Sequence, residues 1–359
     1  MRHGLKKYCT SLTVLIALLA SISSYAQLNI DWNNTYGSDW FESLYTTFET
    51  SDGGFIIGAN AFPNMTTGNI SDPVCGASDF WIIKTDVDGN TIWDFTYGGS
   101  NQELLFALIQ TPDGGFAAAG FTNSPASCQI ADDPIGDIIV SDIDGWVIKV
   151  DGNGILQWET RIGSVNNEIL LTLDNTSDGG IIVGGNSPGT FDNTSNGNDD
   201  MWITKLDGMG NVLWSKTYGG SDGERLEEVR QTPDGGYILA GTSISPISGS
   251  KTAPHLGNWD YYLVKVDANG DFVWDQSYGG GGNDQIYDIE NTPSDGGFIF
   301  GGISASGISG NKTTANMGNW DGWLIKSDIT GNIMWQQSYG GDQFDLIFSI
   351  DVVLSLIHI

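Results

Sequence analysis

Histidine, cysteine and basic residues are scarce in this chain of 359 residues. It contains 3 His and 3 Cys, and its 14 Lys and Arg face 44 Asp and Glu, which gives a net charge of −30 at pH 7. So few His and Cys residues argue against the common zinc sites and against catalysis by histidine. A surface this acidic repels nucleic acid and anionic lipid, so we expect neither as a partner.

Long apolar runs are also missing, except at the N-terminus. A basic start is followed by an apolar run over residues 12–22 and by small residues at Ser24–Ala26. This order is typical of a secretory signal peptide, which we place at residues 1–26. A retained membrane anchor is the alternative. No later segment approaches the roughly 18 apolar residues of a membrane-spanning helix, so we expect no transmembrane segment after signal removal.

Two cysteines remain once Cys9 leaves with the signal peptide. Cys75 and Cys128 lie in long polar segments at related places of neighbouring repeats. In an oxidising compartment they are candidates for a disulfide, and two free thiols are the alternative. No cysteine stands at the predicted cleavage site, which argues against a lipoprotein anchor. The sequence gives no indication of the oligomeric state.

Glycine and aromatic residues are plentiful, and they recur in a repeat of about sixty residues. Each unit begins with a Trp, followed four residues later by an aromatic residue or Ile and then by Gly. An acid comes six residues after that second position, followed by Asp-Gly-Gly and then by an Asp-x-aromatic segment that ends in Lys-x-Asp. The six units begin at Trp32, Trp93, Trp158, Trp214, Trp274 and Trp335.

Each unit divides into four short segments that alternate as strands do. In the second unit they are residues 92–97, 104–111, 116–122 and 146–151, separated by Gly-rich or polar turns. Small residues in the third segment suit close packing against a neighbouring sheet. Four short strands per unit predict an all-β β-propeller with four-stranded blades, of five repeats plus a truncated sixth. A parallel β-helix is the rival, although its coils are usually shorter.

The acid that recurs in all six units allows two interpretations. A carboxylate at this position either accepts backbone N–H groups of a turn or serves as a repeated metal ligand. We favour the structural interpretation. The residues are Glu42, Glu103, Glu168, Glu224, Asp284 and Asp345.

The C-terminus departs from the repeat. The register of the second unit predicts another Pro-Asp-Gly-Gly turn after residue 353, but residues 354–359 read Leu-Ser-Leu-Ile-His-Ile. That hexapeptide matches the in-frame translation of a common sequencing-library adaptor. We therefore expect the repeat domain to cover residues 27–353 and residues 354–359 to be a non-native artefact. A natural apolar terminus is the alternative.

One turn resembles the start of a calcium loop. Asp86 and Asp88 offer carboxylates at alternate positions, as hard cations prefer. The equivalent turns of the other units keep the first Asp and the Gly but lose the second carboxylate, which is typical of a strand-connecting turn. Calcium at Asp86 and Asp88 is therefore a weak candidate, and no other cofactor is predicted.

The loops before the fourth segment vary most between units, and two are near copies. Loops on a rigid scaffold are where binding usually takes place. A Trp among Asn, Asp and Lys could stack on a sugar ring, or it could cap the edge of a blade. The candidate binding residues are Lys251, Trp259 and Asp260 in one loop and Lys312, Trp320 and Asp321 in the other.

Residues 231–241 and 321–335 resemble a large family of secreted bacterial repeat proteins, commonly cargo of the type IX secretion system. The resemblance covers roughly residues 27–353 and implies a secreted or cell-surface location. The Asp-x-x-Gly-x-x-x-Trp element is also distantly similar to quinoprotein-like propellers, but no quinone site can be mapped onto this chain.

The repeated framework beside divergent loops predicts a non-catalytic propeller that binds a carbohydrate, matrix component or extracellular protein. The alternative is a propeller-type polysaccharide hydrolase that uses an Asp/Glu pair. No single pair among the 44 acids stands out from the repeat, so the sequence assigns no catalytic residue.

Overall fold

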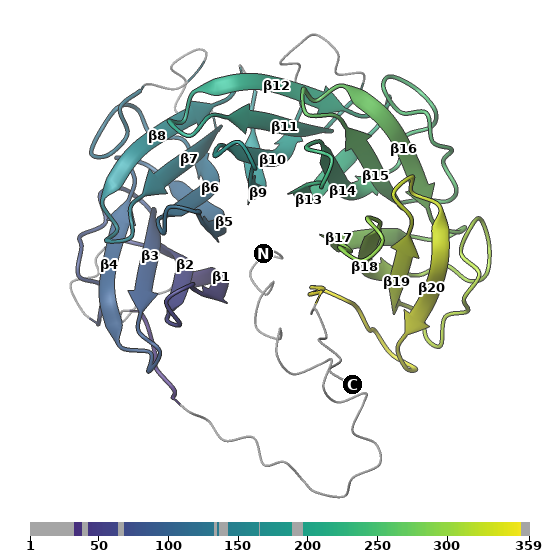
Figure 1. Cartoon of the computed structure of the whole chain (residues 1–359), viewed down its shortest axis with the longest axis horizontal. Helices are drawn as coiled ribbons and strands as arrows, with labels where there is room; N and C mark the ends of the chain where they lie inside the picture. Colours follow the sequence, from purple (N-terminus) through teal and green to yellow (C-terminus); the bar gives the residue numbers. More distant parts are fainter. Residues whose placement is uncertain are drawn as a thin grey trace, which may run out of the picture. The chain divides into compact units, whose positions relative to one another are not determined.

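The described part of this computed structural model contains twenty β-strands in five sheets of four antiparallel strands (Figure 1). The structure describes residues 32–37, 42–63, 68–132, 135, 143–164, 166–188 and 197–352. The predicted signal peptide and residues 354–359 lie outside these ranges. In the described ranges no helix is long and apolar enough to cross a membrane. The all-β prediction and the four-stranded blade are confirmed.

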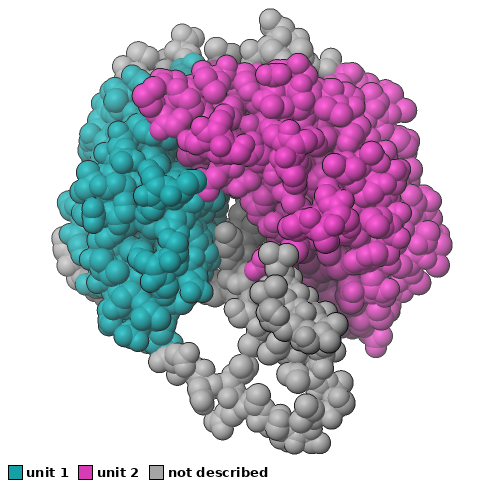
Figure 2. All heavy atoms as spheres, in the orientation of Figure 1, with its two compact units in different colours: residues 1–162 teal, residues 163–359 magenta. Residues whose placement is uncertain are grey.

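The chain forms two compact units, residues 1–162 and residues 163–359, coloured teal and magenta in Figure 2. The first unit holds two sheets and the second holds three, each with its strands paired in chain order. We call the sheets blades 1 to 5. They are β1 (Ser43–Glu49), β2 (Phe55–Ala61), β3 (Asp79–Thr85) and β4 (Thr91–Tyr97); β5 (Glu103–Gln110), β6 (Phe116–Thr122), β7 (Asp144–Val150) and β8 (Leu156–Ile162); β9 (Ile169–Asn175), β10 (Ile181–Ser187), β11 (Asp200–Leu206) and β12 (Val212–Tyr218); β13 (Glu224–Gln231), β14 (Tyr237–Ser243), β15 (Asp260–Val266) and β16 (Phe272–Tyr278); β17 (Asp284–Asn291), β18 (Phe298–Ser304), β19 (Asp321–Ser327) and β20 (Ile333–Tyr339).

The blade and the sequence repeat differ in phase by one strand. The Trp-bearing strand opens the sequence repeat, but it closes the preceding sheet: β4 pairs with β3, and β8 pairs with β7. The reason is the length of the connections. The Asp-x-x-Gly turn is a tight hairpin and keeps its two strands paired, whereas the Gly-Gly segment after the Trp strand leads to the next sheet.

Within each unit, the first strand of a blade packs on the first three strands of the blade before it. In the second unit β13 contacts β9, β10 and β11, and β17 contacts β13, β14 and β15; in the first unit β5 contacts β1, β2 and β3. Apolar side chains fill these junctions, as Ile182 and Ile203 of blade 3 do with Leu226 and Val229 of blade 4. Burial of these surfaces is the main stabilising contribution.

Small residues permit this close packing, as the sequence predicted. They lie in the third segment of the sequence repeat, which is the second strand of the blade. A Cβ atom at Gly120 in β6 would lie 1.9 Å from the carbonyl oxygen of Leu104 and 2.9 Å from the ring of Phe80 in blade 1. Any larger residue would therefore push β5 or blade 1 away from β6.

The Trp and Tyr of each fourth strand anchor the next blade of the same unit. The Tyr hydroxyl donates to a glycine carbonyl in the following β3–β4-type hairpin, from Tyr97 to Gly154 at 2.5 Å, from Tyr218 to Gly270 at 2.5 Å and from Tyr278 to Gly331 at 2.6 Å. Residues 32–37 dock on blade 1 in the same way, with Tyr36 donating to Gly89.

Candidate functional site

Each blade has two polar ends, which differ in what their side chains do. The turn end carries the Asp-Gly-Gly turn and the Asp-x-x-Gly hairpin. The loop end carries the variable loop before the third strand and the connection to the next sheet. Only the loop end has partners that change from blade to blade.

At the turn end, the landmark Lys of the third strand pairs with the Asp of the Asp-Gly-Gly turn. The Lys is buried and also donates to the next backbone carbonyl, as Lys84 does to Thr85 at 2.8 Å. The hydroxyl of Thr50, followed by Lys84, holds the pKa of Asp52 at about 2. The five ion pairs are Lys84–Asp52, Lys149–Asp113, Lys205–Asp178 and Lys265–Asp234 at 3.0 Å and Lys326–Asp295 at 2.9 Å.

We predict that replacing Lys149 by Met lowers the free energy of unfolding by about 1–3 kcal/mol. The substitution strands the carbonyl of Val150, which accepts from Lys149 Nζ at 3.0 Å. Asp113→Asn removes only the exposed partner and should cost about 1 kcal/mol or less. Urea unfolding followed by Trp fluorescence measures both changes. Equal losses in the two variants would contradict this interpretation of the lysine.

The proposed calcium turn has the geometry of a strand connection. Asp86 Oδ1 accepts the backbone N–H groups of Asp88 at 3.0 Å and Asn90 at 2.8 Å, and Oδ2 accepts the Asn90 amide at 2.9 Å. Turns without a second carboxylate, such as the one at Asp207, are closed in the same way. Among the described residues no group of three or more His, Cys, Asp and Glu is placed to hold a metal ion. Calcium at Asp86 and Asp88 stays a prediction.

At the loop end, the recurring acid of the first strand accepts a backbone N–H from the segment just before that strand, as the structural interpretation predicted. Glu103 Oε2 accepts the N–H of Gly99 at 2.7 Å, and Oε1 accepts the Thr122 hydroxyl at 2.5 Å. The other backbone bonds run from Ser164 to Glu168 at 2.9 Å, from Gly220 to Glu224 at 2.7 Å, from Gly280 to Asp284 at 2.8 Å and from Gly341 to Asp345 at 2.7 Å.

A second acid, the first residue of each third strand, is buried beside it. Asp79 Oδ2 accepts the N–H of Cys75 at 2.7 Å, and Asp260 Oδ2 accepts that of Leu256 at 2.7 Å. These aspartates are at most 1% exposed. They therefore fix the end of the variable loop onto the sheet and offer no surface to a large substrate.

Three blades place a basic side chain between these two kinds of acid. Lys251 Nζ donates to Ser277 at 2.8 Å and lies 4.2 Å from the ring centre of Tyr262. Lys312 Nζ donates to Ser338 at 2.9 Å, over Trp323. Both lysines are 1% exposed, and burial lowers the pKa of each while nearby carboxylates oppose the change.

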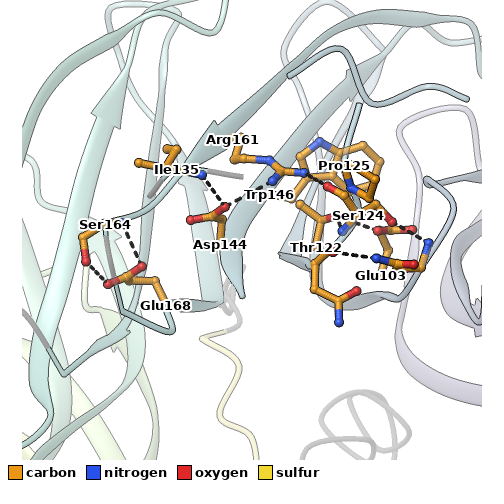
Figure 3. Close-up of polar contacts among 12 residues, drawn as sticks. Glu103, Thr122, Ser124, Pro125, Ile135, Asp144, Trp146, Arg161, Ser164 and Glu168 are labelled. Carbon is orange, nitrogen blue, oxygen red and sulfur yellow. Dashed lines mark hydrogen bonds and ion pairs between the residues drawn. The ribbon is translucent and has the colours of Figure 1, made fainter. Parts of the chain in front are cut away.

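Blade 2 supplies its cation from a different position. Ile130 occupies the position of Lys251, because it pairs with Ser127 as Lys251 pairs with Ser248. Arg161 occupies the position of Ser277, because it lies opposite Trp146 as Ser277 lies opposite Tyr262. Figure 3 shows the Arg161 guanidinium reaching the Ser124 carbonyl and Asp144, with Glu103 bonded to Thr122 nearby. Blade 2 and blades 4 and 5 thus place a basic side chain at the equivalent end of the blade from different sequence positions.

Cys75 and Cys128 form a disulfide between the loops of blades 1 and 2, with their Cα atoms 6.8 Å apart. Cys128 has φ 51°, and the corresponding turn positions of blades 4 and 5 are Gly249 and Gly310, both with φ 59°. The left-handed conformation of this turn favours glycine. A cysteine at this position therefore indicates that the cross-link outweighs the conformational cost.

The six candidate binding residues separate into two groups. Lys251, Asp260, Lys312 and Asp321 are at most 1% exposed and have internal partners. Trp259 and Trp320 are half-buried, and Trp320 contacts Phe344. The lysines have polar neighbours in the sequence. The turn folds them under the loop, so only the two tryptophans can reach a ligand.

A further ionic cluster lies on the first strands of the second unit and was missed from the sequence. Arg230 on β13 contacts Glu228 at 2.7 Å and Glu290 on β17 at 3.0 Å. Burial raises the pKa of Glu290 to about 7 against the attraction of Arg230, and burial also raises the pKa of Asp174 on β9. The sequence shows an Arg in this first strand, and the first strands of the other blades contain none. Its partner on β17 becomes visible only in the packing of the two blades.

No known protein family matches the chain by its sequence profile. A curated relative, the regulatory protein FlaEY of Caulobacter vibrioides, is 28% identical over 167 residues, which span 43% of this chain and 18% of that protein. Among solved structures, the WD40 domain of Neurospora crassa Pan2 has a TM-score of 0.47 at 14% identity and covers 86% of this chain and 82% of that one. A protein of unknown function from Bacteroides caccae has a TM-score of 0.44 at 11% identity, covering 85% and 86%.

Proposed function

We propose that this chain is an exported, non-catalytic β-propeller that binds a glycan, a matrix component or a surface protein at the loop end of blades 4 and 5. One observation carries the proposal. Ile247 and Ile308 lie at the same place in two near-identical turns on adjacent blades, and these residues are 64% and 67% exposed. Single exposed apolar residues are common, but a matched pair on rigid loops indicates a contact surface.

The surrounding residues support this surface. Trp259 and Trp320 lie at the ends of the same two loops and are only half-buried. The loops themselves are held from below by buried Lys251 and Lys312, so their exposed residues are presented by a fixed framework. Aromatic and apolar residues on a rigid support are the usual anchors of binding surfaces.

Location and partners form part of the proposal. The signal-like N-terminus and the resemblance to secreted bacterial repeats, commonly type IX cargo, favour a secreted or cell-surface protein. The net charge of −30 disfavours nucleic acid as a partner. A carbohydrate or an extracellular protein therefore fits best.

The test is a binding screen on glycan arrays and immobilised matrix proteins. For the ligand found, the double variant Ile247→Ser/Ile308→Ser should lose at least about tenfold in affinity, since two apolar anchors are removed. Its unfolding midpoint should not change, because both side chains are exposed. The matched control is Ile155→Ser/Ile329→Ser, which changes two exposed isoleucines at the turn end. Equal loss in the control, or no loss in the loop variant, would refute the assignment.

The hydrolase alternative has one specific candidate. The acid pairs at the loop end are too buried to reach a polymer, but Glu290 has a side chain 28% exposed beside Glu228 and Arg230. A carboxyl group with a pKa of about 7 is suited to general acid catalysis. Polysaccharide turnover that Glu290→Gln abolishes would replace the binding proposal.

A further inference from the structure

Several carboxylate oxygens at the loop end are buried without a hydrogen-bond partner among the described residues. They include Oδ1 of Asp79, Asp260 and Asp321, in aspartates at most 1% exposed. The other oxygen of each accepts a loop N–H. A buried acceptor that makes no hydrogen bond is costly, so its recurrence at one structural position requires a physical cause.

Each of these oxygens faces the recurring acid that follows the Trp-bearing fourth strand of the same blade. A Cβ atom built on Gly98 would lie 2.3 Å from Asp79 Oδ1 and 2.6 Å from Glu103 Oε2, so both oxygens pack against this one glycine. The same contact recurs at Gly279 with Asp260 and Asp284, and at Gly340 with Asp321 and Asp345. The glycine is required there because any side chain would displace the carboxyl groups.

We propose that the Asp79–Glu103 pair shares one proton, so that the otherwise unpartnered Asp79 Oδ1 carries it and donates to the facing Glu103 carboxylate. The pair then bears one negative charge, and Asp79 Oδ1 has a partner. Two ionised carboxylates at this separation in a buried site repel each other strongly. A proton needs neither a cavity nor further ligands, and among the described residues no third acid, His or Cys completes a metal site.

The Asp79–Glu103 pair differs from the other two, because blade 1 has no basic side chain of its own at this end. Ile70 and Thr96 occupy the positions that Lys251 and Ser277 hold in blade 4. The charged groups that act on the pair are Asp72 in the loop of blade 1 and Arg161 on β8 of blade 2, which attracts Glu103. The sequence contains no Lys or Arg between Lys7 and Lys84.

The expected titration agrees with this arrangement. Burial raises the pKa of Asp79 from 3.8 to about 6, with a contribution from Glu103, against the N–H of Cys75. Burial also raises the pKa of Glu103, against the N–H of Gly99. Since the folded protein holds the proton more tightly than the unfolded chain, this stability is complete below pH 3.8 and is lost as the pH rises through about 6. Acidification from pH 7.5 to 5 should therefore stabilise the junction of blades 1 and 2.

The test uses Asp79→Asn, because asparagine resembles the protonated acid. Its amide NH₂ can donate to Glu103, while its carbonyl keeps the N–H of Cys75. We expect an unfolding midpoint in urea at pH 7.5 equal to or above that of the wild type, and a smaller gain on acidification to pH 5. The control is Asp52→Asn at the turn end of the same blade, where the acid has a pKa of about 2. This control should keep the wild-type pH dependence.

A second measurement does not depend on how well the variant folds. Infrared difference spectra of the wild-type protein should show a protonated carboxyl signal that titrates near pH 6, and Asp79→Asn should reduce its amplitude. Absence of this signal would overturn the proposal, as would a large loss of stability in a folded Asp79→Asn variant at every pH. Stabilisation by added calcium that requires Asp79 would also overturn it, since a metal ion would then occupy the pair.

Discussion

Replacing Arg161 by Met is expected to lower the free energy of unfolding by about 3–5 kcal/mol, because it leaves a buried charge without its partner. Arg161 Nη1 lies 3.2 Å from Asp144 Oδ2, and the two side chains are 1% and 0% exposed. The guanidinium also donates to the carbonyl of Ser124. Its loss takes the guanidinium away from both acceptors, and methionine fills only the volume.

Chemical unfolding at pH 7.5 measures this loss, and a second variant tests its cause. Arg161→Ser combined with Ile130→Lys recreates in blade 2 the arrangement of Lys251 and Ser277 in blade 4. The double variant should recover at least half of the stability lost in Arg161→Ser alone. If it does not, the stability of blade 2 depends on the particular hydrogen bonds of Arg161, and a positive charge in this region is not enough.

Reduction of the Cys75–Cys128 disulfide is expected to cost about 4 kcal/mol on the chain-entropy estimate for a loop of this length. The two cysteines are 53 residues apart in sequence, and the bond joins the loops of blades 1 and 2. Unfolding with and without a reductant measures the difference. An unchanged midpoint would contradict the expectation.

The matched control is Cys75→Ser/Cys128→Gly. It should be insensitive to the reductant, and it should be slightly more stable than the reduced wild type. The reason is that glycine suits the φ of 51° at position 128, as Gly249 and Gly310 show in the other blades. If this variant were less stable than the reduced protein, the side chain of Cys128 would contribute packing beyond the bond.

The strands were predictable from the sequence because their signals are local. The segment expected at 116–122 is β6 to the residue, and those expected at 92–97 and 104–111 are β4 and β5 within a residue at each end. The grouping of strands into blades was not obvious from the repeat. It depends on which connections are tight hairpins. The sequence repeat has the same period wherever the first residue of a unit is placed, so the period does not show where a blade begins.

The candidate site was predicted less well. The turn acceptor role of Glu103 and its equivalents is confirmed, because the spacing to the preceding Gly-Gly is local. Lys251 and Lys312 were predicted as binding residues, and both lie buried beneath their loops. Polar neighbours in the sequence suggest solvent, but a turn through a left-handed glycine reverses the chain and directs the lysine inward.

The sequence by itself determined the all-β class, the four strands of each blade, the turns and the acidity, because each depends on residues within a few positions of one another. Only the tertiary structure decided which charges meet. It brings Asp79 to Glu103, joins Arg161 to Asp144, and gathers Arg230 with acids from a neighbouring blade. These contacts join different strands or blades, and the free energy of a buried charge depends on the partners that packing provides and not on its neighbours in the chain.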